Sequence, residues 1–179
     1  MPLTVEWIRA ANDDDALFGL LSGELQRLLP REVLGDRDLY QATLRSMPRG
    51  LRAMAGMHFF DVNMALDDLA WHFGNQNDER DLSETLSGLR ELELSAVADC
   101  FQSAWKIMEP YLDRIRSNDR DGMEPSEWYE HMGIQRQIDP LNQTVRKIAE
   151  GLGKKGLLES WVHYARKYPE RCVMAEAKA

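Results

Sequence analysis

The chain has 179 residues, of which 44% are hydrophobic and 29% are charged, and its formal net charge is −8 at pH 7. This composition is typical of one folded domain and excludes a fibrous or largely disordered protein. Apolar runs such as Leu17 to Leu21 are far shorter than the roughly 20 residues of a membrane helix, and the sequence begins without a basic-then-apolar signal pattern. We therefore expect one soluble, cytoplasmic domain over residues 1–179 that makes no contact with a membrane.

Apolar residues recur at three- and four-residue steps along the whole chain, whereas strand patterns are essentially missing. Turn signals such as Pro30, Pro48 and residues 74–78 separate the periodic segments. The pattern predicts helices at residues 13–29, 38–47, 49–73, 81–92, 95–116, 126–132, 140–152 and 158–168. The predicted fold is therefore all-α, a single-domain orthogonal helical bundle of about seven or eight helices.

Three of these helices have features that affect their course. The helix from residue 49 toward residue 73 is long for a helix without an internal cap, so we expect it to bend or break. Its core face is expected to carry Val62, Leu66, Leu69 and Phe73. Pro110 removes a backbone hydrogen bond and should kink the helix at 95–116. Asp139 and Pro140 have the residue types that cap and open a helix, here the one at 140–152.

The negative charge is concentrated in the middle of the sequence. Residues 61–99 include ten acidic and two basic residues, whereas residues 1–60 include eight and seven, and residues 100–179 include twelve and thirteen. A surface built from the central segment would repel phosphate and attract cationic partners. We expect its helices to gather their uncompensated carboxylates into one outward-facing anionic patch. An acidic face that only keeps the protein in solution is the alternative.

One helical face within this central segment carries a tryptophan among carboxylates. Asp61, Met64, Asp68 and Trp71 stand three or four residues apart, beside the predicted core face. An exposed ring rimmed by carboxylates is the composition of a binding hot spot for a basic protein. The ring supplies desolvated area, and the carboxylates pair with arginine or lysine. Packing of Trp71 beneath another helix is the alternative.

The loop motifs and cysteines give no sign of a catalytic or redox site. Residues 117–128 place Trp128 where a calcium loop needs a bidentate glutamate, and residues 151–156 lack the GxxxxGK[ST] spacing of a phosphate loop. No GxSxG nucleophile motif is present. Cys100 and Cys172 have no CxxC spacing, so we expect both thiols to stay reduced.

Two histidines stand four residues after a carboxylate on predicted helices. The pairs are Asp68 with His72 and Glu127 with His131, and this spacing lets two side chains share one metal ion. A hydrogen-bonded histidine explains each pair without a metal, so we expect no metal and no cofactor. A metal-dependent enzyme using Asp67, Asp68 and His72 stays open as an alternative function.

Short motifs follow one another from the middle of the chain to its C-terminal part. They are PRGLR at residues 48–52, FDVN at 60–63, HFGN at 72–75, ETL at 84–86, WY at 128–129 and YARKYPE at 164–170. Over residues 47–170 this series resembles the bacterial all-α domain family of unknown function that includes the neisserial DNA-mimic protein. The Asn-Gly-Gly turn of that family is missing, because Asn63 is followed by Met64 and Ala65.

The resemblance implies a homodimeric helical protein whose acidic surface imitates the charge of a DNA duplex. Such a protein binds a DNA-binding protein in place of DNA. Helical carboxylates three or four residues apart can form an ordered row of negative charge. A net charge of −8 is modest for a mimic of a polymer that carries one charge per roughly 1.7 Å.

The leading hypothesis is a non-enzymatic interaction protein whose acidic surface binds a basic partner, either a DNA-binding regulator or a toxin that it neutralises. The residues expected to bind this partner are Asp61, Asp67, Asp68, Trp71, Asp78, Glu79, Asp81, Glu84 and Glu91. A further alternative is direct nucleic-acid binding through the basic C-terminal helices. These carry Arg146, Lys147, Lys154, Lys155, Arg166 and Lys167.

Overall fold

The computed structural model describes residues 2–174, and all regular structure in this range is helical. The helices are α1 (Val5–Ala10), α2 (Asp14–Leu28), α3 (Arg31–Leu34), α4 (Arg37–Ser46), α5 (Arg49–Leu66), α6 (Leu69–Asn75), α7 (Glu79–Glu91), α8 (Ser95–Met108), α9 (Leu112–Arg116), α10 (Pro125–His131), α11 (Ile134–Leu152) and α12 (Glu159–Lys167). Short 3-10 turns occur at Glu109–Tyr111, Gly156–Leu158 and Pro169–Arg171. The all-α prediction is confirmed. Residues 1 and 175–179 of the predicted domain lie outside the described residues.

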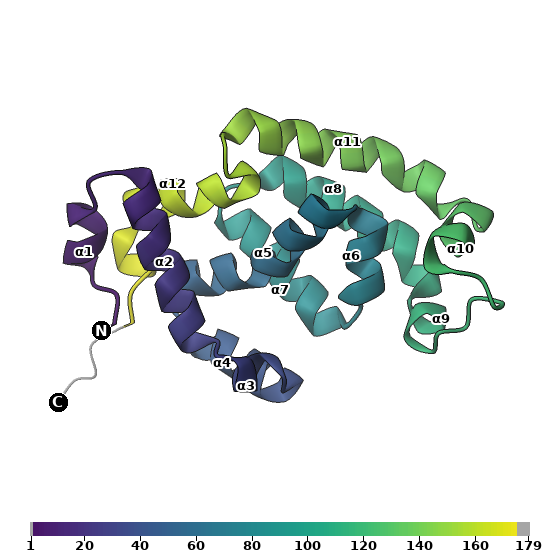
Figure 1. The fold of residues 1–179 in the computed structure, drawn as a ribbon, viewed down its shortest axis with the longest axis horizontal. Helices are drawn as coiled ribbons and strands as arrows, with labels where there is room; N and C mark the ends of the chain where they lie inside the picture. Colours follow the sequence, from purple (N-terminus) through teal and green to yellow (C-terminus); the bar gives the residue numbers. More distant parts are fainter. Residues whose placement is uncertain (1, 175–179) are drawn as a thin grey trace.

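The helices form an elongated molecule with α5 and α7 near its centre (Figure 1). Helix α11 runs along one side above α8, and the two are in direct contact. Helices α1, α2 and α12 lie at one end of the molecule, whereas α9 and α10 lie at the other. Short helices α3 and α4 connect α2 to α5. One continuous hydrophobic core, from Leu3 to Cys172, runs through this arrangement.

Helices α5 and α7 approach each other closely because glycines stand at their crossing. A Cβ atom on Gly88 would lie 2.6 Å from the carbonyl oxygen of Ala53, and one on Gly56 would lie 2.8 Å from the carbonyl oxygen of Glu84. The Thr85 hydroxyl donates a hydrogen bond to the Gly56 carbonyl oxygen at 2.9 Å. Any larger residue at either glycine would therefore push the two helix backbones apart.

The long helix predicted from residue 49 toward residue 73 breaks at Asp67, as the lack of an internal cap indicated. Helix α5 ends at Leu66, and the side chain of Asp68 caps the new helix α6. The break changes the direction of the helical faces, so the predicted core face is wrong for two residues. Val62 is exposed and Leu66 is 74% exposed, whereas Leu69 and Phe73 are fully buried.

The predicted count of seven or eight helices is too low, and prolines account for part of the difference. Pro110 does more than kink the predicted helix, because the chain around it forms a 3-10 turn that separates α8 from α9. Pro140 was expected to open a helix but lies inside α11, which begins at Ile134. The start of α11 follows Gly133, which has a positive φ of 67°. Helices α1 and α3 are too short to give a clear periodic signal.

Among residues 2–174, no helix is long and apolar enough to cross a membrane. The two cysteines are both free and both buried. A Cβ atom on Gly50 would lie 2.7 Å from the Cys172 sulfur atom, so this thiol packs tightly against α5. Burial raises the pKa of the Cys172 thiol to about 12. Both cysteines therefore act as small apolar core residues, as the sequence indicated.

We predict that Gly88→Ala lowers the free energy of unfolding by about 2 kcal/mol, because the added methyl group overpacks the contact of α7 with the Ala53 carbonyl. The matched control is Gly19→Ala on α2, where a Cβ atom meets no other atom within 4 Å. This control should gain about 0.5–1 kcal/mol from its higher helix propensity. Urea unfolding followed by circular dichroism measures both changes. Equal stability of the two variants would contradict the close α5–α7 contact.

Candidate functional site

A large concave surface of the described chain is a groove formed by α6, α10 and the start of α11, with a volume of about 970 Å³. We call it the acidic groove. Its lining residues are Asp67, Asp68, Trp71, Glu124, Pro125, Ser126, Tyr129, Glu130, Gly133, Gln135, Arg136 and Asp139. The acidic groove thus brings together Asp67, Asp68 and Trp71, three of the residues that the sequence analysis assigned to partner binding.

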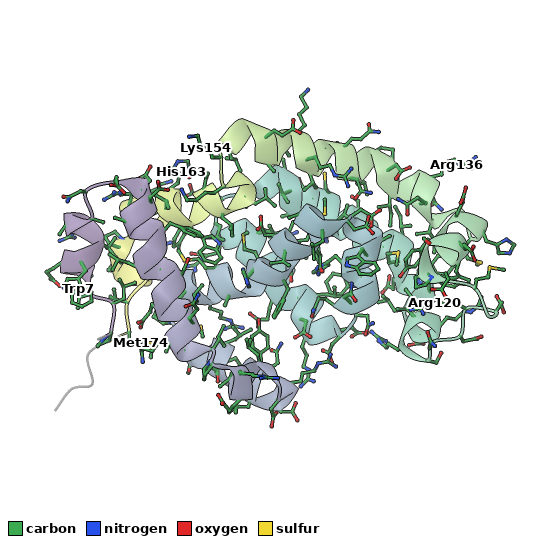
Figure 2. All side chains as sticks on the ribbon, viewed as in Figure 1. Trp7, Arg120, Arg136, Lys154, His163 and Met174 are labelled. Carbon is green, nitrogen blue, oxygen red and sulfur yellow. The ribbon has the colours of Figure 1, made fainter. Side chains whose placement is uncertain are left out.

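The acidic groove carries a strong excess of negative charge. Five carboxylates line it, on Asp67, Asp68, Glu124, Glu130 and Asp139, against the single guanidinium of Arg136. None of these five carboxylates forms an ion pair within residues 2–174. Figure 2 shows Arg136 at the end of α11 that lies beside α10. Concave walls of one charge sign concentrate the electric field, so this surface attracts cations.

Trp71 supplies an exposed aromatic surface in the acidic groove, where its side chain is 41% exposed. On α6 its neighbours Ala70, His72 and Phe73 point into the core, which directs Trp71 outward. The expectation that Trp71 is exposed next to carboxylates is therefore confirmed, and packing beneath another helix does not occur. A tryptophan face can attract a lysine ammonium or an arginine guanidinium through its π electrons.

The buried carboxylate of Asp68 fixes the wall of the acidic groove. Its Oδ1 atom accepts a hydrogen bond from the Trp71 backbone N–H at 2.8 Å. Its Oδ2 atom accepts hydrogen bonds from the side-chain amides of Gln135 at 2.8 Å and Asn142 at 3.3 Å. The Asn142 side-chain oxygen in turn accepts from the Leu69 backbone N–H at 3.0 Å. These contacts tie the first turn of α6 to α11 with neutral donors only.

The Gln135 amide also joins two carboxylates of the acidic groove. Its Nε2 atom donates to Asp68 and to Asp139, both at 2.8 Å. Asp139 therefore lies within α11 and lines the groove. The expectation that it caps a helix is wrong. Further along α11, Arg146 donates to the backbone carbonyl oxygen of Asp67 at 2.6 Å. This contact satisfies a backbone acceptor at the C-terminal end of α5 and leaves the Asp67 carboxylate without an ion pair.

Tyr129 of α10 forms part of the groove wall next to α6. Its hydroxyl is buried and has no hydrogen-bond partner among the described residues. A Cβ atom on Gly74 would lie 2.8 Å from this hydroxyl, so a glycine is needed for α10 to approach α6 so closely. Burial raises the pKa of Tyr129, so its hydroxyl is neutral near pH 7. It adds no charge to the wall.

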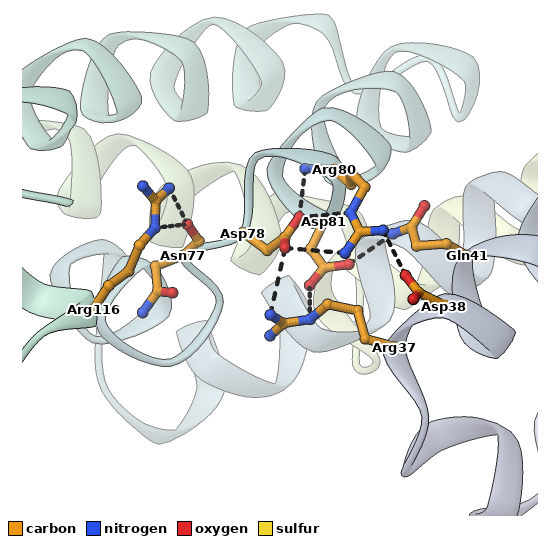
Figure 3. A network of polar contacts seen from close by, with 8 residues as sticks. All are labelled: Arg37, Asp38, Gln41, Asn77, Asp78, Arg80, Asp81 and Arg116. Carbon is orange, nitrogen blue, oxygen red and sulfur yellow. Dashed lines mark hydrogen bonds and ion pairs between the residues drawn. The ribbon is translucent and has the colours of Figure 1, made fainter. Parts of the chain in front are cut away.

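Four other predicted site residues lie outside the acidic groove and are paired with cations. Asp78 and Asp81 contact Arg37, and Asp78 also contacts Arg80, in the network drawn in Figure 3. The Gln41 side-chain amide donates to Asp81 at 2.7 Å, which joins α4 to the start of α7 (Figure 3). This part of the chain therefore presents compensated carboxylates, unlike the acidic groove.

The other two paired carboxylates, Glu84 and Glu91, connect α7 to residues that lie far away in the sequence. Arg52 of α5 pairs with Glu84 at 2.5 Å. Glu91 pairs with Arg49 at 2.5 Å and with Arg171 at 3.5 Å, and it accepts a hydrogen bond from the Tyr164 hydroxyl. The expectation of one continuous, uncompensated patch is therefore wrong in its extent, because arginines from outside residues 61–99 neutralise much of the central charge.

The remaining predicted residues, Asp61 and Glu79, also lie outside the lining of the acidic groove. Glu79 is exposed and forms no ion pair within the described range. Asp61 is half-buried on α5, and burial without any nearby cation raises the pKa of its carboxyl to about 6. Its negative charge at neutral pH is therefore a cost to folding.

The residues of the alternative metal site are not assembled. His72 is fully buried among Phe60, Phe73 and Phe101, and its Nδ1 atom lies 3.0 Å from the Asn63 side-chain nitrogen. Burial lowers the pKa of His72 to about 3, so the ring is neutral. Within residues 2–174, no three His, Cys, Asp or Glu side chains are placed to hold a metal ion.

Three of the six basic residues named for the C-terminal helices are paired with carboxylates. Lys155 pairs with Asp15, Arg166 with Asp14 at 3.4 Å, and Lys167 with Glu93 at 2.7 Å. Arg146 is held by the Asp67 carbonyl oxygen. The local basic excess seen in the sequence is therefore only partly neutralised, since Lys147 and Lys154 form no ion pair within residues 2–174.

Sequence reasoning missed three groove carboxylates, those of Glu124, Glu130 and Asp139. The charge of residues 100–179 is nearly balanced, and counting over that long segment hides a local excess. A shorter window would have found the signal, because residues 121–139 contain five carboxylates and one arginine. Their approach to Asp67 and Trp71 depends on tertiary packing.

We predict that Asp61→Asn raises the free energy of unfolding at pH 7 by about 1 kcal/mol, which allows for the partial exposure of this side chain. In the folded protein the carboxyl titrates near 6, whereas in the unfolded chain it titrates near 3.9. Wild-type stability therefore falls as the pH rises through this window, and the gain in the variant disappears as the pH falls to about 4. Urea unfolding at several pH values measures the difference in the free energy of unfolding between the variant and the wild type. Asp99→Asn, an exposed α8 residue, is the control. A gain that is the same at every pH would argue against a desolvated Asp61.

In comparisons with known proteins, no protein-family model matches this chain, and no curated protein or solved structure matches it significantly. The resemblance to the DNA-mimic family therefore rests on the sequence motifs alone.

Proposed function

We propose that this protein is a non-enzymatic interaction module whose acidic groove binds a basic segment of a partner protein. The observation that carries the proposal is the exposed Trp71 ring within a concave surface lined by five carboxylates that have no ion pairs in the described chain. Carboxylates that already hold arginines, such as Glu84 and Glu91, are partly neutralised and attract a further cation less strongly. The groove carboxylates have no such contacts within residues 2–174.

The chemistry of the acidic groove fits an arginine-bearing or lysine-bearing segment. A cationic head group that lies over Trp71 gains cation–π attraction, while its N–H groups reach carboxylates such as Asp67 or Asp139. Arginine gains more than lysine from this arrangement, because its planar guanidinium both stacks on a ring and donates in parallel to a carboxylate. The excess of negative charge accelerates association at low salt.

A DNA-binding regulator or a basic toxin is the class of partner that we propose. Phosphate-binding surfaces of such proteins present arginine and lysine, so occupation by groove carboxylates would compete with nucleic acid. The family resemblance adds DNA mimicry by a homodimer as the specific form of this function. The two free thiols favour a reducing compartment, and we propose that the protein acts in the bacterial cytoplasm.

We predict that a nona-arginine peptide binds the wild-type protein and that the triple variant Glu124→Gln, Glu130→Gln, Asp139→Asn loses at least about tenfold in affinity, because three unpaired groove charges are removed. Isothermal titration calorimetry at 50 mM and 300 mM salt measures the effect, and binding should weaken steeply between them.

The matched control removes the same number of charges elsewhere, in the triple variant Glu32→Gln, Asp99→Asn, Glu150→Gln. These residues are exposed, and none of them lines the acidic groove. This variant should bind within about twofold of the wild type, because net charge alone has a weak effect. Equal losses of affinity in both triple variants would show that the peptide responds only to the overall charge of the protein, and would contradict binding in the acidic groove.

We further predict that Trp71→Ala weakens peptide binding about fivefold to tenfold, whereas Trp71→Phe keeps roughly half of the binding energy contributed by the ring. Trp71 is partly exposed and its backbone contact to Asp68 is retained in both variants, so folding should be preserved. Calorimetry with nona-arginine gives the affinities and circular dichroism checks the fold. Unchanged affinity in Trp71→Ala would show that carboxylates bind the peptide without the ring.

A further inference from the structure

A second concave surface, with a volume of about 440 Å³, lies where α5 and α7 pack together near the centre of the molecule (Figure 1). We call it the arginine pocket. Its lining residues are Arg49, Arg52, Ala53, Glu84, Ser87, Gly88, Arg90 and Glu91. None of them lines the acidic groove. Three arginines against two glutamates give this lining an excess of one positive charge, in a chain whose net charge is −8.

The guanidinium groups of the arginine pocket are more exposed than its carboxylates. The side chains of Arg49 and Arg52 are 68% and 40% exposed. Their carboxylate partners, Glu91 and Glu84, are only 11% and 12% exposed. An anion that approaches from solvent therefore meets the guanidinium groups first and stays farther from the carboxylates. Because Coulomb energy falls with distance, the attraction by the nearer cations exceeds the repulsion by the carboxylates.

The same ion pairs hold two guanidinium groups in fixed orientations. Arg52 donates to the Glu84 carboxylate through Nε at 2.8 Å and through Nη2 at 2.5 Å, which is the two-point geometry of a strong arginine–carboxylate pair. Arg49 donates to Glu91 through Nε at 2.5 Å, and its Nη2 atom lies 2.5 Å from the same oxygen. The Nη1 atom of each arginine has no hydrogen-bond partner among residues 2–174. Fixed donors of this kind bind an oxyanion with little further loss of side-chain entropy.

Arg90 supplies the third guanidinium group and the surplus positive charge. It is exposed on α7 and forms no ion pair within the described range. Its Nη2 atom donates to the Gln102 side-chain oxygen at 2.9 Å, and its other N–H groups have no partner there. The exposed Ser87 hydroxyl, which lines the same pocket, likewise forms no hydrogen bond within residues 2–174. The pocket therefore offers unused donors on three guanidinium groups and one hydroxyl.

We propose that the arginine pocket binds the phosphate group of a small molecule. A phosphate monoester carries close to two negative charges and three terminal oxygens, which suits three guanidinium groups, whereas a carboxylate carries one charge and two oxygens. A volume of about 440 Å³ leaves room for the organic part of such a molecule. The net charge of the chain repels a long polyanion, which favours a small ligand over a nucleic acid strand. This site is independent of the acidic groove and its proposed partner.

Inorganic pyrophosphate is the probe that tests the proposal, and isothermal titration calorimetry in 100 mM sodium chloride measures its affinity. We expect pyrophosphate to bind the wild-type protein with a dissociation constant of about 0.1–1 mM. Acetate, which presents a carboxylate in place of phosphate, should bind at least about tenfold more weakly. A twelve-nucleotide oligothymidylate should bind no more tightly than pyrophosphate, because most of its phosphates would face a negatively charged protein.

Two matched pairs of variants locate the binding. Ser83 and Ser87 are exposed positions one turn apart on α7, and only Ser87 lines the arginine pocket. Ser87→Glu places a carboxylate among the guanidinium groups and should weaken pyrophosphate binding at least about tenfold, whereas Ser83→Glu should stay within about twofold of the wild type. Arg90→Gln should weaken binding about fivefold, and Arg31→Gln, at an exposed position of α3, should not. All four substitutions leave the arginine–glutamate pairs intact, so the variants should fold, which circular dichroism checks.

Three results would overturn the proposal. The first is a pyrophosphate dissociation constant of the wild type above about 10 mM, or acetate binding as tight as that of pyrophosphate. The second is an equal loss of affinity in Ser87→Glu and Ser83→Glu, since pyrophosphate would then respond only to the overall charge of the protein. The third is an oligothymidylate that binds more tightly than pyrophosphate, because this would assign the arginines to a nucleic acid strand.

Discussion

A single buried carboxylate, that of Asp68, determines how α6 sits against α11, and the shape of the acidic groove depends on it. The carboxylate caps α6 through the Trp71 N–H and binds the amides of Gln135 and Asn142 on α11. All of these donors are neutral, and the Asp68 carboxylate forms no ion pair within residues 2–174. The same contacts start α6 in a new direction after the end of α5. As a result Trp71 points outward and Asp67 lines the acidic groove. Fold and charge distribution are therefore set by the same interaction.

Two groups of acidic residues in this chain have different roles. Those of α7 hold tertiary structure, because Glu84 binds Arg52 of α5 and Glu91 binds Arg49 and Arg171 from distant parts of the chain. Partly buried ion pairs of this kind position helices that glycines bring close together. The carboxylates of the acidic groove form no ion pair with arginine or lysine within residues 2–174, so they are available to the cationic partner that we propose.

The sequence predicts what depends on local periodicity and misses what depends on distant contacts. Amphipathic spacing predicted the helical class and the positions of α2, α4, α7, α10 and α12 to within a few residues, whereas the helix predicted over residues 95–116 is divided near Pro110. The exposure of Leu66 could not be foreseen, because it follows from a helix break whose cap, Asp68, is stabilised by residues more than 60 positions away. Charge counting identified the acidic segment. The pairing of Glu84 with Arg52 depends on tertiary packing, so the counting could not predict it. Of the two alternatives that the sequence left open for Trp71, the exposed one is correct, because its outward direction follows from its neighbours on one short helix and not from the predicted face of Val62 and Leu66.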